Sequence, residues 1–200
     1  QAKAIDALLV HFSTDYVFKG DNKEGYTEEA KPEPQSQYAR SKFLGEQRIA
    51  ETVARRPDWR YYLIRTSRLF GSPAATTSAK PSFVEVILKL AADKPFLEVI
   101  DEEVSSPTYT PDLAAATREL ILSGRPSGIY HLTNSDACTW YGWAQEILKL
   151  AELNVPLKPV PASRFPRLAP RPAHSILLNT KLPHLRPWQE ALNEFLISNF

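Results

Sequence analysis

Short apolar segments alternate with segments of helical periodicity along this chain, and that alternation limits the possible folds more than any other feature of the sequence. Short apolar runs predict strands at 8–14, 61–70, 97–100 and 128–133. Apolar residues at helical spacing, together with capping residues and Pro111 in a first turn, predict helices at 36–56, 82–92, 111–123, 140–153 and 187–200. Strands that alternate with helices indicate an α/β fold with a mainly parallel sheet.

The last quarter of the chain differs in composition from the rest. Eight of the 17 prolines fall between Pro156 and Pro187. Because proline fixes the backbone and cannot donate a ladder hydrogen bond, this stretch is expected to form loops and short strands. We expect it to form a smaller lobe packed on the sheet.

Charge and cysteine usage exclude several classes of partner. The formal net charge is +1, so no overall field favours a nucleic acid or a membrane surface. No apolar run approaches the ~20 residues that span a bilayer, and no signal peptide is recognisable. The single cysteine, Cys138, excludes an internal disulfide and fits a reducing compartment, so a cytoplasmic protein is expected.

The strongest local motif is the pair Tyr38 and Lys42 at the start of the first predicted helix. Spacing of i and i+4 places the phenol and the ammonium on one helix face. A nearby ammonium favours the phenolate, which suits a tyrosine that gives a proton to a carbonyl oxygen gaining negative charge. The same spacing also occurs by chance in many helices, where it is only a surface pair.

Hydroxyl and carboxyl side chains follow the first predicted strand. Ser13, Thr14 and Asp15 stand at its carboxyl end, which is where ligands bind in open α/β sheets. A hydroxyl at this point could donate to the same carbonyl oxygen as Tyr38. Alternatively, Ser13 and Thr14 only satisfy backbone groups where the strand ends.

Motifs along most of the chain resemble those of dTDP-4-dehydrorhamnose reductases, which belong to the extended short-chain dehydrogenases. The resemblance runs from about residue 9 to 182 and keeps the order of the motifs. They are Ser13–Phe18, Gly20, Tyr26, Glu28, Pro34, Tyr38, Ser41–Lys42, Gly45–Glu46, Arg65–Ser67, Phe70–Gly71, Ser106–Thr108, Asp112–Ala114, Gly128–Asn134, Arg171–Pro172, Ser175 and Asn179–Leu182.

The resemblance implies a reaction, a cofactor and a substrate. NADPH, or alternatively NADH, would deliver hydride to C4 of a 4-keto-6-deoxy sugar carried on dTDP. Tyr38 would be the proton donor, Lys42 would hold the nicotinamide ribose, and Thr14 would stabilise the developing oxyanion. By the same resemblance Ser13 and Arg65 would join Tyr38 and Lys42 in cofactor binding, and substrate contacts would come from Thr14, Asp15, Arg68 and Arg171.

One of these positions departs from the family pattern. The family has a tryptophan at the position of Arg68, where it lines the sugar pocket. Exchanging an aromatic wall for a guanidinium changes both shape and charge. The exact sugar is therefore open. Three arginines on a proline-stiffened loop, Arg164, Arg167 and Arg171, are candidates for the substrate diphosphate, with a solvated basic loop as the alternative for the first two.

Other candidate sites have weaker support. The four histidines and Cys138 lack metal-ligand spacing, and His11 and His131 are expected to be structural. No G-x-S-x-G motif supports a serine hydrolase. We expect Trp140 to belong to the core and the segment Asp101–Glu103 to be a solvated acidic turn.

The sequence contains no glycine-rich pyrophosphate-binding turn, since its seven glycines form no G-x-G-x-x-G run. The first residues, Gln1–Ala7, are expected to be the tail of a helix. We therefore expect a partial doubly wound (Rossmann-type) sheet. Residues 1–135 would form its second half with interleaved substrate-lobe segments, and residues 136–200 mainly the C-terminal substrate-binding lobe.

Such a chain is expected to have little or no reductase activity alone. Its unpaired sheet edge would favour an oligomer, for example a homodimer. Two other functions stay open. One is a non-catalytic nucleotide-sugar-binding or regulatory relative, and the other is a related sugar-nucleotide epimerase or dehydratase.

Overall fold

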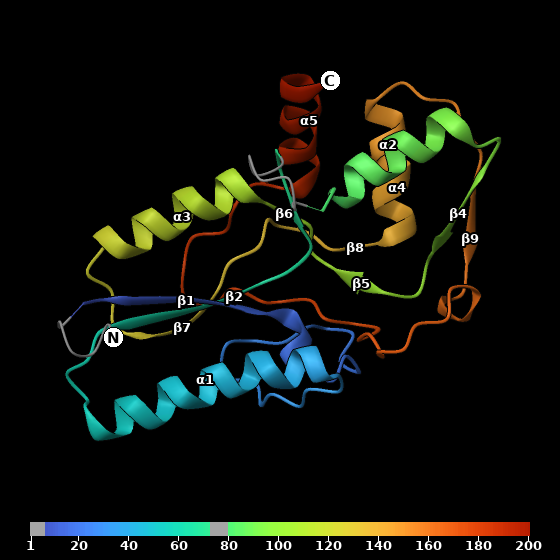
Figure 1. Cartoon of the computed structure of the whole chain (residues 1–200). Coiled ribbons are helices and arrows are strands. Elements are labelled where there is room, and N and C mark those ends of the chain that lie inside the picture. The colour runs from blue at the N-terminus through green and yellow to red at the C-terminus, as the bar shows by residue number, and fades with distance from the viewer. Residues whose placement is uncertain (1–6, 73–79) are drawn as a thin grey trace.

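Three parallel strands form the centre of the computed structural model, which describes residues 7–72 and 80–200. They are β1 (Leu9–Thr14), β2 (Tyr61–Thr66) and β7 (Gly128–His131), in the order β1-β2-β7. Helix α1 (Gln37–Arg55) covers one face of this sheet and α3 (Thr110–Leu122) the other (Figure 1). The expected α/β fold with parallel strands is confirmed.

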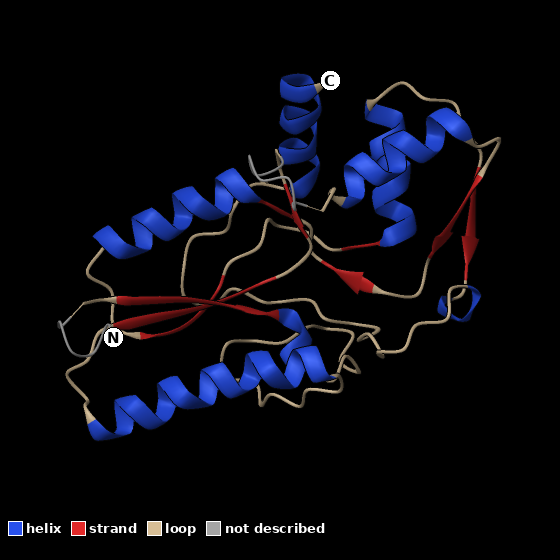
Figure 2. Ribbon diagram, viewed as in Figure 1, coloured by secondary structure: helices blue, strands red, loops and turns tan. Residues whose placement is uncertain are grey.

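The second part of the molecule is built from helices and short strand pairs, distinguished by secondary structure in Figure 2. Its elements are α2 (Phe83–Asp93), β4 (Leu97–Ile100), β5 (Val104–Ser105), β8 (Cys138–Thr139), α4 (Trp140–Leu150), β9 (Leu157–Val160), η3 (Ala162–Arg164) and α5 (Trp188–Asn199). Strand β4 pairs in parallel with β9, and β5 pairs antiparallel with β8. The remaining elements are η2 (Asp15–Val17), β3 (Leu69–Phe70) and β6 (Thr108–Tyr109), with β3 and β6 paired in parallel.

Side-chain caps explain where several helices begin. Ser36 accepts from the backbone N–H of Ala39 at the start of α1, and Thr139 accepts from Gly142 at the start of α4. At α2, Ser82 and Glu85 form a reciprocal capping box. Helix α4 then packs against both α2 and α5, around a core that contains Trp143, Leu192 and Phe195.

Two predicted elements have different limits in the structure. The strand predicted over 61–70 is interrupted after Thr66, because Arg68 adopts a left-handed φ of 41° before the short β3 begins. The helix predicted to reach Leu153 ends at Leu150. The expected helix tail at Gln1–Ala7 lies almost wholly outside the described residues. No helix in the described ranges is long and apolar enough to cross a membrane.

Candidate active site

A cavity of about 370 Å³ opens at the carboxyl ends of β1 and β2, the edge at which ligands bind in open α/β sheets. Of the site residues that the family resemblance implies, all but Arg65 line it, whereas the loop candidates Arg164 and Arg167 do not. Its lining consists of Phe12, Ser13, Thr14, Asp15, Tyr16, Tyr38, Lys42, Thr66, Ser67, Arg68, Leu69, Trp140 and Arg171.

Three hydroxyl groups surround the carboxyl group of Asp15 at the inner wall of this cavity. Ser175 donates to it at 2.6 Å, Ser67 at 2.8 Å and Thr14 at 3.0 Å. Burial raises the pKa of Asp15, and the hydrogen bonds from these hydroxyls oppose the rise. Asp15 therefore ties the end of β1 to β2 and to the C-terminal segment.

The hydroxyl of Thr14 is already engaged on both sides. It accepts from the backbone N–H of Tyr16 at 3.2 Å and donates to Asp15. A hydroxyl carries a single proton, so Thr14 can donate to a substrate oxygen only by turning that proton away from Asp15. Asp15 would then keep its bonds from Ser67 and Ser175.

Helix α1 presents Tyr38 and Lys42 to the same cavity. The ammonium of Lys42 donates to the backbone carbonyl of Phe12 at 2.7 Å, which anchors it beside the end of β1. The ring of Tyr38 meets that of Tyr16 edge-on, with centroids 6.1 Å apart, and remains 55% exposed. The exposed phenol can therefore be reached by a ligand in the cavity.

Arg65 occupies a different environment from the one expected for a cofactor-binding residue. Its guanidinium is buried and forms a bidentate pair with Glu46, with N···O distances of 2.7 and 3.1 Å. Ser13 also donates its hydroxyl to Glu46, at 2.5 Å. Both side chains thus fix α1 onto β1 and β2, because Glu46 belongs to α1, and Arg65 does not line the cavity.

His131 completes this buried cluster on β7. Its Nδ1 lies 3.1 Å from the carbonyl oxygen of Leu178, and its Nε2 lies 3.5 Å from a guanidinium nitrogen of Arg65. A carbonyl only accepts and a guanidinium only donates, so the neutral ring with a proton on Nδ1 satisfies both. Burial, with a contribution from Arg65, lowers the pKa of His131 to about 4.

Arg68 projects from the turn after β2 against Trp140. Its guanidinium carbon lies 4.0 Å from the indole centroid, and its N–H groups donate to the carbonyls of Cys138 at 2.8 Å and Glu103 at 2.7 Å. Burial lowers the pKa of Arg68 below its ordinary value. The side chain thus forms a charged wall of the cavity.

The acidic turn expected at Asp101–Glu103 is wrong for Glu103, which is 6% exposed. Its carboxylate accepts from the indole N–H of Trp140 at 2.9 Å and from Arg167 at 2.5 Å. The positive charge of Arg167 and the indole N–H of Trp140 both meet this carboxylate, which explains its burial. Glu103 therefore orients both neighbours.

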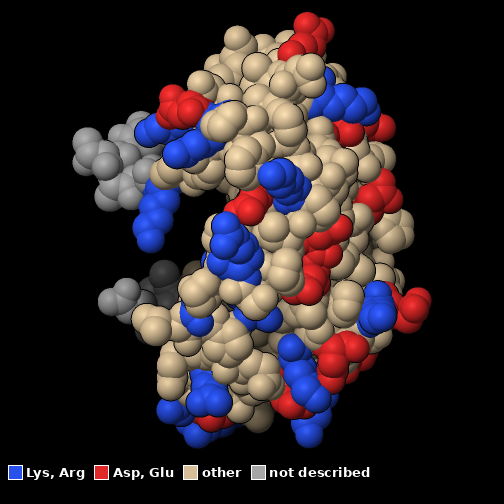
Figure 3. Space-filling model, turned by 90° about the vertical axis from the view of Figure 1, so that its right-hand side faces the viewer, with Lys and Arg blue, Asp and Glu red and all other residues tan. Residues whose placement is uncertain are grey.

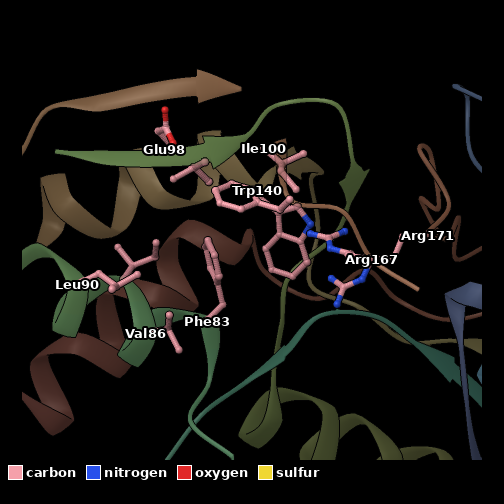
Figure 4. Close-up of a pocket in the computed structure, with 11 residues that line it drawn as sticks. Phe83, Val86, Leu90, Glu98, Ile100, Trp140, Arg167 and Arg171 are labelled. Carbon is pink, nitrogen blue, oxygen red and sulfur yellow. The ribbon is translucent and has the colours of Figure 1, made fainter. Parts of the chain in front are cut away.

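A second, more apolar cavity of about 200 Å³ adjoins the first one. Figure 4 shows apolar side chains of α2 on one side of Trp140, with two arginines on the other. Trp140 and Arg171 line both cavities. The lining is Phe83, Val86, Ile87, Leu90, Glu98, Val99, Ile100, Trp140, Phe165, Arg167 and Arg171.

The three arginines of the proline-rich loop differ in their ion-pair partners and in the cavities that they line. Arg164 pairs with Glu98 at 2.9 Å near the surface and lines neither cavity. Arg167 pairs with Glu103, and Arg171 reaches both cavities. Figure 3 shows one face of the molecule, on which Lys and Arg side chains surround an indentation.

Sequence reasoning missed three residues of this site. Trp140 was expected in the core, yet it lies between the two cavities and lines both. Glu103 orients Trp140 through the hydrogen bond to its indole N–H. Tyr16 is a second phenol in the larger cavity. Burial, with the charge of Asp15 adding to it, raises the pKa of Tyr16. Only the position of Tyr16 directly after the Ser13–Asp15 segment could have indicated its role.

Metal and thiol chemistry find no support among the described residues. No group of His, Cys, Asp and Glu side chains in the described ranges is arranged to hold a metal ion. Burial raises the pKa of Cys138 to about 12, which keeps the thiol protonated near neutral pH.

Comparison with known proteins identifies the family. Residues 1–199 match the family described as the RmlD substrate binding domain. A dTDP-4-dehydrorhamnose reductase from Bacillus anthracis, solved in complex with NADP, superposes with a TM-score of 0.88 and 32% identity over 99% of this chain and 68% of that chain. The chain belongs to the dTDP-4-dehydrorhamnose reductase family.

Two curated relatives extend this reductase family match. The spore coat polysaccharide biosynthesis protein SpsK of Bacillus subtilis is 38% identical over 98% of this chain and 66% of the relative. A dTDP-4-dehydrorhamnose reductase of Streptomyces griseus is 34% identical over 96% of this chain and 63% of the relative. The chain thus spans slightly less than two thirds of the length of these relatives.

Proposed function

We propose that this chain supplies the substrate site and the proton donor for NADPH-dependent reduction of the C4 ketone of dTDP-4-dehydro-6-deoxy-L-mannose, which gives dTDP-L-rhamnose. The observation that carries the proposal is the convergence of Thr14, Tyr38 and Lys42 on one cavity at the carboxyl ends of β1 and β2. Membership of the dTDP-4-dehydrorhamnose reductase family supports the choice of reaction.

The residues present fit the nicotinamide end of the cofactor. Lys42 donates one hydrogen bond to the carbonyl of Phe12, and its ammonium has two further N–H groups that can bind ribose hydroxyls. Tyr38 stands four residues earlier on the same face of α1. When bound, NADPH supplies the hydride. We propose NADPH over NADH because a reductase of the same family was solved in complex with NADP.

Proton supply and charge stabilisation are the tasks of this chain. Tyr38 donates its phenolic proton to the C4 oxygen, and the nearby charge of Lys42 stabilises the phenolate that remains. Thr14 turns its hydroxyl proton from Asp15 to the same oxygen, which stabilises the negative charge that develops there. The fixed network around Asp15 holds Thr14 in place during this change.

The two adjoining cavities fit the two ends of a nucleotide sugar. The cavity with Tyr38 takes the sugar, and the apolar cavity between α2 and Trp140 takes the thymine base. Arg171 lines both cavities and is placed to contact the diphosphate between them.

We further propose that the 200 residues alone reduce the substrate poorly. The sequence has no G-x-G-x-x-G turn, and that turn binds the pyrophosphate of a dinucleotide at a helix N-terminus. The adenine side of NADPH therefore lacks its usual anchor within this sequence.

Activity is best tested in a chimera in which this chain replaces the matching part of the Bacillus anthracis reductase. Such a chimera should oxidise NADPH in the presence of the 4-keto substrate, and Tyr38→Phe should lower kcat by at least about 100-fold because general acid catalysis is lost. Tyr141→Phe, on α4 and outside the larger cavity, is the matched control.

A folded chimera without turnover would contradict the proposed reaction. If it still bound dTDP-L-rhamnose, the second candidate would gain support, namely a non-catalytic nucleotide-sugar-binding relative. The charged Arg68 at the cavity wall, where the family resemblance implies a tryptophan, is the observation that favours this candidate.

A further inference from the structure

The boundary between the two cavities is marked by Trp140 and Arg171, which line both. A ligand long enough to occupy both cavities must pass this boundary. In a nucleotide sugar the part that joins base and sugar ends is a diphosphate, which is anionic. The charges that face this boundary therefore decide how the ligand is held.

Arg68 is fixed at this boundary by neutral partners. Its hydrogen bonds reach the backbone carbonyls of Glu103 and Cys138, which belong to the region of the β5–β8 strand pair. Its guanidinium stacks on Trp140 with 4.0 Å between the guanidinium carbon and the ring centroid. Two carbonyls and an aromatic face orient the side chain without neutralising its charge.

Within the described residues Arg68 has no ion-pair partner. Among the carboxylates near the larger cavity, Asp15 is occupied by three hydroxyls, and Glu103 directs its carboxylate to Trp140 and Arg167. A partly desolvated cation without a counter-ion is costly, and the lowered pKa of Arg68 reflects that cost. An anionic ligand in the cavity would remove it.

The backbone at Arg68 is also strained. Its φ of 41° lies in the left-handed region, which a long side chain rarely adopts. Such conformations persist where surrounding contacts determine them, and they concentrate at ligand-binding sites. Here the left-handed backbone conformation interrupts the chain between β2 and β3 and turns the Arg68 side chain onto Trp140.

We propose that Arg68 is a phosphate-binding residue that holds the diphosphate of the nucleotide sugar together with Arg171. Guanidinium N–H groups match phosphate oxygens in a fixed fork, and Arg68 arrives already oriented, so little side-chain entropy is lost on binding. This inference rests on the proposed function. It assigns to Arg68 a phosphate contact in place of the sugar contact that the family resemblance implied.

The test is calorimetric titration of the full 200-residue chain with thymidine, dTMP and dTDP. The wild-type chain should bind dTDP more tightly than thymidine. Arg68→Gln should weaken dTDP binding by at least about 10-fold, the size of one charge-assisted hydrogen bond, and leave thymidine binding unchanged. Arg118→Gln, an exposed arginine on α3 away from both cavities, is the matched control and should change neither affinity.

An equal loss of thymidine and dTDP affinity in Arg68→Gln would mean that Arg68 only positions Trp140, and this would overturn the proposal. Unchanged dTDP affinity would overturn it as well. If Arg68→Gln does not fold by circular dichroism, Arg68→Lys takes its place, with the same selective loss of dTDP affinity expected because the fork is lost.

The same titrations distinguish a failure of the proposed function from a failure of the inference about Arg68. A folded wild-type chain that binds neither thymidine nor dTDP would contradict the nucleotide-sugar site itself, and the phosphate contact with it. If dTDP binding instead depends on Arg171 but not on Arg68, the nucleotide-sugar site stands and only the inference about Arg68 falls.

Discussion

Thr14 shows how single residues of the cavity combine a structural and a chemical task. Its hydroxyl caps the 3-10 turn at Tyr16 and donates to the buried Asp15. Thr14→Val keeps the shape but removes both bonds, so the free energy of unfolding should fall by about 1–2 kcal/mol. Urea unfolding measures this loss. Thr14→Ser keeps the hydroxyl and should stay close to wild type, and equal losses in both variants would assign the effect to packing.

His131 makes the stability of the chain depend on pH. Its pKa is lowered to about 4 in the folded chain, mainly by burial, against an ordinary value of 6.5. Between these values the unfolded chain binds the extra proton, so stability is full above pH 6.5 and is lost as the pH falls towards 4. The loss is at most about 3 kcal/mol.

His131→Asn removes this titration, so its free energy of unfolding should fall less than that of the wild type between pH 7 and about 4.5. Urea unfolding at both pH values gives the comparison. His184→Asn, at an exposed histidine outside the buried cluster, controls for the loss of an imidazole as such. Parallel losses in wild type and His131→Asn would show that another group causes the pH dependence.

At the scale of elements, the loop after β1 sets the position of the segment that carries Arg171. Gly20 has a φ of 89°, and a Cβ there would lie 2.3 Å from the Cβ of Pro172. Gly20→Ala should therefore lower stability by more than about 1 kcal/mol and displace Arg171 from the cavities. Gly124→Ala, also at a positive φ but without a neighbour within 4 Å, is the control for backbone strain alone.

Two measurements separate these effects. Thermal unfolding compares the stability of Gly20→Ala and Gly124→Ala, and calorimetry with dTDP compares their affinities. Only Gly20→Ala should lose dTDP affinity, because only this substitution moves the Arg171 segment. An affinity equal to that of the wild type would show that the loop contact does not position Arg171.

Local sequence patterns predicted the helices and main strands well because apolar periodicity and caps act within a few residues. Strands β1 and β7 and helix α1 lie within two residues of their predicted limits, whereas β2 begins where predicted and ends four residues early. The break at Arg68 was not predictable in this way, since arginine has no preference for a positive φ. Contacts with Trp140 and with two distant carbonyls hold it there.

The same distinction applies to the candidate site. Residues that carry motifs, such as Tyr38, Lys42 and Thr14, meet in one cavity as the parallel topology implies. The burial of Glu103 and the ion pair of Arg65 with Glu46 depend on partners far away in the sequence. Spacing along the chain carries no information about such partners.

For the whole molecule, the proposed division of labour is that this chain holds the nucleotide sugar and the proton donor, while the adenine side of NADPH needs a glycine-rich turn that the sequence does not contain. The most direct test is calorimetric titration of the folded chain with dTDP-L-rhamnose and, separately, with NADPH. The prediction is saturable binding of dTDP-L-rhamnose and much weaker binding of NADPH. Tight binding of NADPH without binding of dTDP-L-rhamnose would contradict it.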